Sequence, residues 1–72
     1  MNEEFIFKTA DEASVEEQKA AVELALAYNL PVDVIHNPAS MNTNVYIRIP
    51  KGLIFVRDMI ESKAKLQEAK KP

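Results

Sequence analysis

The sequence predicts a small α+β domain: a single-layer mixed β-sheet with two helices packed on one face, in the order β-α-β-β-(β)-α. Two observations lead there. Short segments of alternating apolar and polar residues, typical of half-buried strands, flank a longer stretch of helical periodicity. The chain has 72 residues, which suits one domain and is too short for two. The expected domain spans residues 1–72, with a frayed end over residues 67–72.

The first strand is expected at Glu4–Lys8, which is aromatic and β-branched. A helix is expected over Val15–Tyr28. Ser14 is the preferred N-cap, because its hydroxyl and the Glu17 carboxylate form the capping box Ser-x-x-Glu, in which each accepts from a free backbone amide. Residues 9–12 (Thr-Ala-Asp-Glu) offer an overlapping second box.

Two further strands are expected after the helix. Asn29 can adopt the left-handed conformation of a helix end, and Pro31 prevents the helix from continuing. Val32–His36 then forms a strand that runs parallel to the first if both share a sheet. Asn44–Ile49 alternates apolar and polar residues and is expected to pair antiparallel with Val32–His36 across a polar loop.

The stretch after Ile49 allows two interpretations. In the preferred one, residues 50–52 form a tight turn, Leu53–Val56 forms a fourth strand, and Asp58 caps a helix that starts at Met59. In the alternative, one long helix runs from about Lys51 to Ala69. The first is preferred because the long helix lacks a capping residue at its start and the run Ile-Phe-Val favours strands.

The first helix is apolar on more sides than its own sheet requires. Between Ala20 and Tyr28 its only charged residue is Glu23, whereas a surface helix needs a single apolar stripe. One stripe is expected to pack on the sheet: Val15, Gln18, Val22, Ala25, Leu26 and Asn29. A second side is expected to be a partner or self-interface: Ala20, Leu24, Ala27 and Tyr28. Alternatively, the last helix of the same chain covers this second side.

Charge is unevenly distributed along the chain. Residues 1–47 carry eight acidic and two basic side chains, and residues 48–72 carry seven basic and three acidic ones. The basic third is a possible nucleic-acid contact through Arg48, Lys51, Arg57, Lys63 and Lys65. The alternative is an ordinary solvated helix face with ion pairs, and the net charge of −2 and the pI near 5.3 argue against a dedicated nucleic-acid binder.

An acidic cluster precedes and begins the first helix. It could act as a mimic of phosphate groups and occupy a basic groove on a partner. The same carboxylates also suit the positive end of the helix dipole and need no partner. The cluster consists of Asp11, Glu12, Glu16 and Glu17.

No motif in the sequence indicates catalysis. His36 is the only histidine and has no evident nucleophile or co-ligand. Cysteine is absent, which removes disulfides and thiolate metal sites. We therefore expect no enzyme activity, no catalytic residue, no metal, no cofactor and no small-molecule substrate.

The sequence instead favours a small binding or regulatory protein of the inhibitor or adaptor type, as found in mobile elements and phages. We expect it to act through protein–protein contacts, as a homodimer, with nucleic-acid binding as the alternative. The acidic start does not resemble a signal peptide, and no apolar run approaches the ~20 residues of a membrane span. A cytoplasmic protein without a membrane partner is expected. If the second side of the helix is an interface, glutamate at Leu24 and Tyr28 would separate the partners without unfolding the chain.

Overall fold

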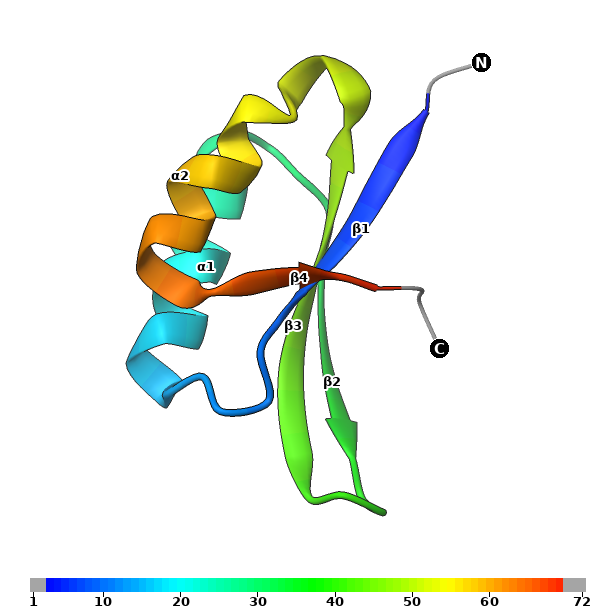
Figure 1. Ribbon diagram of the computed structural model, residues 1–72, viewed down its shortest axis with the longest axis vertical. Helices are drawn as coiled ribbons and strands as arrows, with labels where there is room; N and C mark the ends of the chain where they lie inside the picture. The colour runs from blue at the N-terminus through cyan, green and yellow to red at the C-terminus, as the bar shows by residue number, and fades with distance from the viewer. Residues whose placement is uncertain (1–2, 70–72) are drawn as a thin grey trace.

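The computed structural model describes residues 3–69 and shows both helices on one face of a four-stranded sheet (Figure 1). The predicted α+β class is confirmed. Within the described range, the opposite face of the sheet carries no helix. The elements follow in the order β1 (Glu4–Thr9), α1 (Val15–Ala27), β2 (Val32–Asn37), β3 (Asn42–Pro50), the short 3-10 helix η1 (Lys51–Leu53), α2 (Phe55–Ala64) and β4 (Leu66–Glu68).

The strands lie in the order β2-β3-β1-β4, and every neighbouring pair is antiparallel. The expected mixed sheet is therefore wrong, although the predicted antiparallel pairing of β2 with β3 is confirmed. β1 and β2 do run in the same direction, but β3 lies between them, so they never become parallel neighbours. This element order and strand order are those of the split β-α-β, or ferredoxin-like, motif.

The core lies between the sheet and the two helices. Phe7 of β1 is opposite Ile47 of β3, and side chains directly opposite each other point to the same face of a sheet. The alternation predicted for β3 is confirmed, because its apolar side chains are buried there. The buried apolar cluster comprises Phe7, Ala21, Ala25, Leu30, Val45, Ile47, Ile49, Val56, Ile60, Ala64 and Leu66.

The ends of α1 follow the local signals in the sequence. The Ser14 amide donates to Glu17 Oε1 at 2.9 Å, and the Glu17 amide donates to Ser14 Oγ at 3.1 Å, so the predicted capping box is formed. Asn29 has the expected left-handed conformation, with φ of 57°. The helix ends at Ala27, one residue before its expected end.

The second possible capping box does not form, because Thr9 belongs to β1. Its side chain is completely buried, and its Oγ1 accepts a hydrogen bond from the Val45 amide at 3.0 Å. The Thr9 carbonyl accepts from the Asn44 amide nitrogen Nδ2 at 2.9 Å. These bonds tie the end of β1 to β3 at the point where the chain leaves the sheet.

Removing the N-cap hydroxyl by Ser14→Ala is expected to lower the free energy of unfolding by about 1 kcal/mol. Hydrogen bonds from the Ser14 backbone and side chain lower the pKa of Glu17 below its ordinary 4.5. A pKa that is lower in the folded state adds stability above the unfolded value, and this contribution is lost as pH falls through the folded value. Ser14→Ala keeps the backbone amide, which is the first cause of this shift, so the difference in stability between wild type and variant should shrink only slightly below pH ~4.5.

Urea denaturation at neutral and acidic pH measures this difference. The matched control is Ser62→Ala on α2, where the hydroxyl donates to the Met59 carbonyl at 2.8 Å and caps no free amide. The control should change stability by less than about 0.5 kcal/mol. Equal effects of the two substitutions at pH 7 would contradict the role assigned to Ser14.

The preferred interpretation of the segment after Ile49 is wrong. Residues 51–53 form η1, and Leu53–Val56 forms no strand because α2 already begins at Phe55. Asp58 lies inside this helix and does not cap it. The alternative of a long helix agrees better with the structure, but α2 ends at Ala64. The next residue, Lys65, has a left-handed conformation with φ of 48°.

Tertiary packing explains why this segment is helical although the run Ile-Phe-Val favours strands. Val56, Ile60 and Ala64 are four residues apart and all completely buried, so the helix covers the half of the sheet that α1 leaves open. The chain then returns to the sheet edge as β4. Of the end expected to fray over residues 67–72, Gln67 and Glu68 lie in β4 and the Ala69 amide donates to the Ile6 carbonyl at 2.8 Å. Residues 70–72 lie outside the described residues.

Candidate interaction surface

The side of α1 expected to be an interface faces α2 over part of its area. The Tyr28 ring packs edge-to-face on Phe55 with centroids 6.2 Å apart, and the Tyr28 hydroxyl donates to Met59 Sδ at 3.5 Å. Leu24 and Tyr28 are half-buried against the core. Ala20 is also half-buried, and only Ala27 of the four is exposed. The alternative in which the last helix covers this side therefore describes Tyr28.

The stripe of α1 that is expected to pack on the sheet is only partly buried. Ala25 is completely buried, but Val15 is 72% exposed and Leu26 is 59% exposed. The centre of the buried face is shifted toward Ala21, which is also completely buried. The buried face of α1 is therefore displaced from the expected sheet-facing stripe. One flank of the helix meets α2, and the other flank stays open beside β2.

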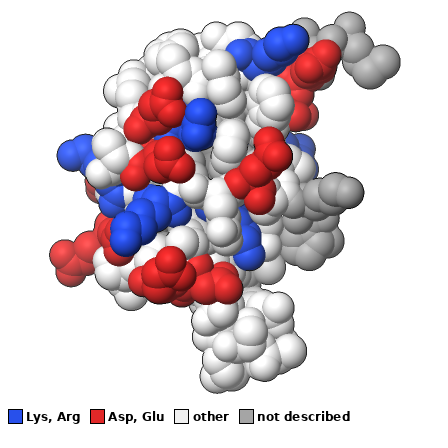
Figure 2. Space-filling view, in the orientation of Figure 1, with Lys and Arg blue, Asp and Glu red and all other residues white. Residues whose placement is uncertain are grey.

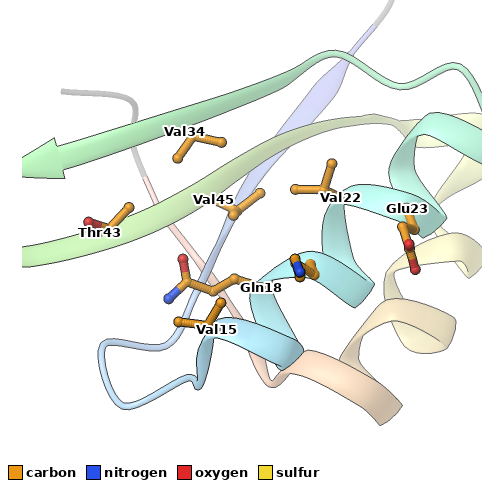
Figure 3. Close-up of a pocket in the computed structure, with 8 residues that line it drawn as sticks. Val15, Gln18, Val22, Glu23, Val34, Thr43 and Val45 are labelled. Atoms are coloured by element: carbon orange, nitrogen blue, oxygen red, sulfur yellow. The ribbon is translucent and has the colours of Figure 1, made fainter.

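A groove lies between this open flank of α1 and the β2–β3 pair (Figure 3). Its volume is about 450 Å³. Val34 of β2 is 63% exposed and points to the helix side of the sheet, because it is opposite the buried Val45. Figure 3 shows both valines across the groove from Val15 and Val22. The complete lining is Val15, Gln18, Lys19, Val22, Glu23, Val34, Thr43 and Val45.

The outer wall of this groove is a free sheet edge, since β2 is the end strand of the sheet and six residues long. The Arg48 amide donates to the Pro31 carbonyl at 3.1 Å, so Pro31 and Arg48 are a hydrogen-bonded pair of the antiparallel β2–β3 ladder. Because hydrogen-bonded and non-hydrogen-bonded pairs alternate in an antiparallel ladder, the residues one, three and five positions later direct their backbone groups outward. These are Val32, Val34 and His36.

Charge is sparse beside the groove. No Asp, Glu, Lys or Arg occurs from Val34 to Ile47, and the end of the β2–β3 hairpin is correspondingly white at the bottom of Figure 2. The charged residues in the groove lining are Lys19 and Glu23 of α1. In the part of the chain that the structure describes, neither forms an ion pair. His36 Nδ1 lies 2.9 Å from Thr43 Oγ1.

The five basic residues proposed for nucleic-acid contact are dispersed. Arg48 is on the outer face of β3, since it is opposite Ile6 and alternates with buried residues. Lys51 lies 3.8 Å from Glu3. Arg57 Nη1 lies 3.5 Å from Glu61, and its guanidinium is 5.8 Å from the Phe7 ring centre. The last two, Lys63 and Lys65, are exposed at the end of α2.

The acidic cluster is partly used within the chain. Glu17 belongs to the capping box. Asp11 Oδ1 accepts from Asn44 Nδ2 at 3.1 Å and lies 3.7 Å from the Lys8 ammonium. Glu12 and Glu16 are exposed. Two of the four carboxylates thus have structural contacts that account for their positions.

Two other hollows are more polar. One, of about 460 Å³, lies on the outer face of the sheet around Lys8, Asn44 and Tyr46. The other, of about 450 Å³, lies beside β4 and includes Arg57, whose carboxylate neighbours are Asp58 and Glu61. Among residues 3–69, no group of three His, Asp or Glu residues could hold a metal ion, and neither helix is long and apolar enough to cross a membrane.

Sequence reasoning missed the groove, because Val34 becomes part of an exposed surface only when β2 lies at the sheet edge. The available signal was the excess of apolar residues on α1, part of which lines the groove through Val15 and Val22. Comparisons with protein-family models, with curated proteins and with solved structures give no match for this chain.

Proposed function

We propose that this chain is a non-enzymatic binding protein that acts through protein–protein contacts, as a homodimer, with the α1–β2 groove as its contact surface. The observation that carries the proposal is the apolar groove beside a free strand edge. Exposed apolar surface that borders unpaired backbone groups is what a partner strand can cover. In this proposal the contact surface includes Val15 and Val34, in place of the side of α1 with Leu24 and Tyr28 that is expected from the sequence.

The chemistry of the groove supports binding more than catalysis. Four valines dominate its lining, and its polar members are Gln18, Lys19, Glu23 and Thr43. A catalytic site needs a nucleophile or acid–base pair within hydrogen-bond reach of the substrate. The valines offer packing area instead, and removing apolar area from water contributes about 25 cal/mol per Å².

Light scattering at two concentrations tests the proposal. Wild type is expected near twice the chain mass of 8.1 kDa, and Val34→Glu near the monomer mass, because it places a charge in the apolar contact. Since Val34 is 63% exposed in the single chain, the variant should keep its circular dichroism spectrum. Gln67→Glu on the opposite edge strand is the control and should remain dimeric.

A wild-type protein that stays at 8.1 kDa at both concentrations would contradict the proposed homodimer. An unchanged mass for Val34→Glu would show instead that the dimer uses another surface.

A further inference from the structure

We propose that a second copy of this chain pairs its β2 with β2 antiparallel, about a two-fold axis at Val34, so that the two sheets join into one of eight strands. This inference rests on the proposed function and adds the geometry of the contact. In a two-fold interface the same surface is used by both copies and must therefore be complementary to itself. The α1–β2 surface meets this condition in its backbone, its apolar side chains and its charges.

The backbone argument comes from the free edge of β2. Val32, Val34 and His36 direct their amide and carbonyl groups outward, as the Arg48–Pro31 hydrogen bond shows. If the axis passes at Val34, this residue exchanges both hydrogen bonds with the partner's Val34, and Val32 does so with the partner's His36. All three free positions are then used.

The side chains favour the same register. Residues directly opposite each other across an antiparallel pair share a face, so Val34 would cover the partner's Val34 beside the two grooves. An axis at Asp33 would place two like charges opposite each other, which is destabilising. With the axis at Val34, Asp33 is opposite the partner's Ile35 on the outer face.

The charges at the groove are also self-complementary. Lys19 and Glu23 are one helical turn apart on the flank of α1 that lines the groove. The two-fold axis reverses the direction of the partner's α1, so that the order of Lys19 and Glu23 along one helix is opposite to their order along the other, and in the proposed dimer each lysine approaches the partner's glutamate. Their lack of ion pairs within residues 3–69 leaves both available for this contact.

The size of the molecule is compatible with such an interface. A stable interface buries about 800 Å² on each partner, which is roughly one-sixth of the 4827 Å² surface of this chain. The other sheet edge is a weaker candidate, because β4 is three residues long and very short edge strands are poor templates for pairing.

Oxidation of Val34→Cys tests the register, because the wild-type chain contains no cysteine. Opposed residues of a hydrogen-bonded pair have Cα atoms about 5.5 Å apart, within the range that a disulfide spans. We expect most of the Val34→Cys protein to become a covalent dimer under mild oxidation at micromolar concentration. Gln67→Cys on β4 is the matched control and should remain mainly uncrosslinked.

A charge exchange gives an independent measurement. Lys19→Glu and Glu23→Lys should each weaken the dimer about tenfold, and the double variant should recover most of the wild-type affinity. A protein that is dimeric by light scattering but fails both to crosslink at Val34→Cys and to recover in the double variant would overturn this geometry while leaving the proposed function intact. A monomeric wild type would overturn both.

Discussion

Replacing Leu24 and Tyr28 together by glutamate is expected to unfold the domain. Tyr28 contacts Phe55 and Met59 of α2, and Leu24 packs against the core. Two carboxylates at these positions would be partly removed from water without a partner, and the aromatic contact with α2 would be lost. We expect a loss of several kcal/mol, against a total stability of roughly 4–11 kcal/mol for a chain of this length.

Circular dichroism and urea denaturation measure this effect. The matched control is Ala27→Glu, which introduces the same charge at an exposed position of the same helix. The control should fold like wild type. If the double variant folds and only its oligomeric mass changes, the interface includes this flank of α1. That result would contradict the internal packing described above.

Ile47→Ala is expected to have the second large effect, with a loss of about 2–5 kcal/mol. Ile47 is completely buried in β3, which pairs with both β2 and β1. Truncating its side chain removes apolar contacts and leaves a cavity between the sheet and the helices. In a domain of this size the variant should be largely unfolded at moderate temperature.

Thermal and urea denaturation compare this variant with Leu26→Ala. Leu26 loses a similar apolar volume but is 59% exposed on a helix, where alanine is favourable, so its change should stay within about 0.5 kcal/mol. Ile47→Val should lie between them, at about 1 kcal/mol. Equal stabilities for Ile47→Ala and Leu26→Ala would contradict the burial of β3.

The sequence by itself determined the elements whose signals are local. The capping box of Ser14 and Glu17 defined the start of α1, and Asn29 defined its end. The alternation from Asn44 to Ile49 assigned the inward face of β3. These predictions succeeded because a capping hydroxyl acts on amides two or three residues away and side chains alternate along every strand.

Only the tertiary structure decided the strand order, the state of residues 51–56 and the flank of α1 that stays open. The run Ile-Phe-Val favours strands locally, yet burial of Val56, Ile60 and Ala64 against the sheet makes this segment part of a helix. Likewise, Val34 is exposed because β3 pairs with β1 and leaves β2 at the edge. Such outcomes depend on contacts between distant residues, which outweigh weak local propensities and which no single segment of the sequence encodes.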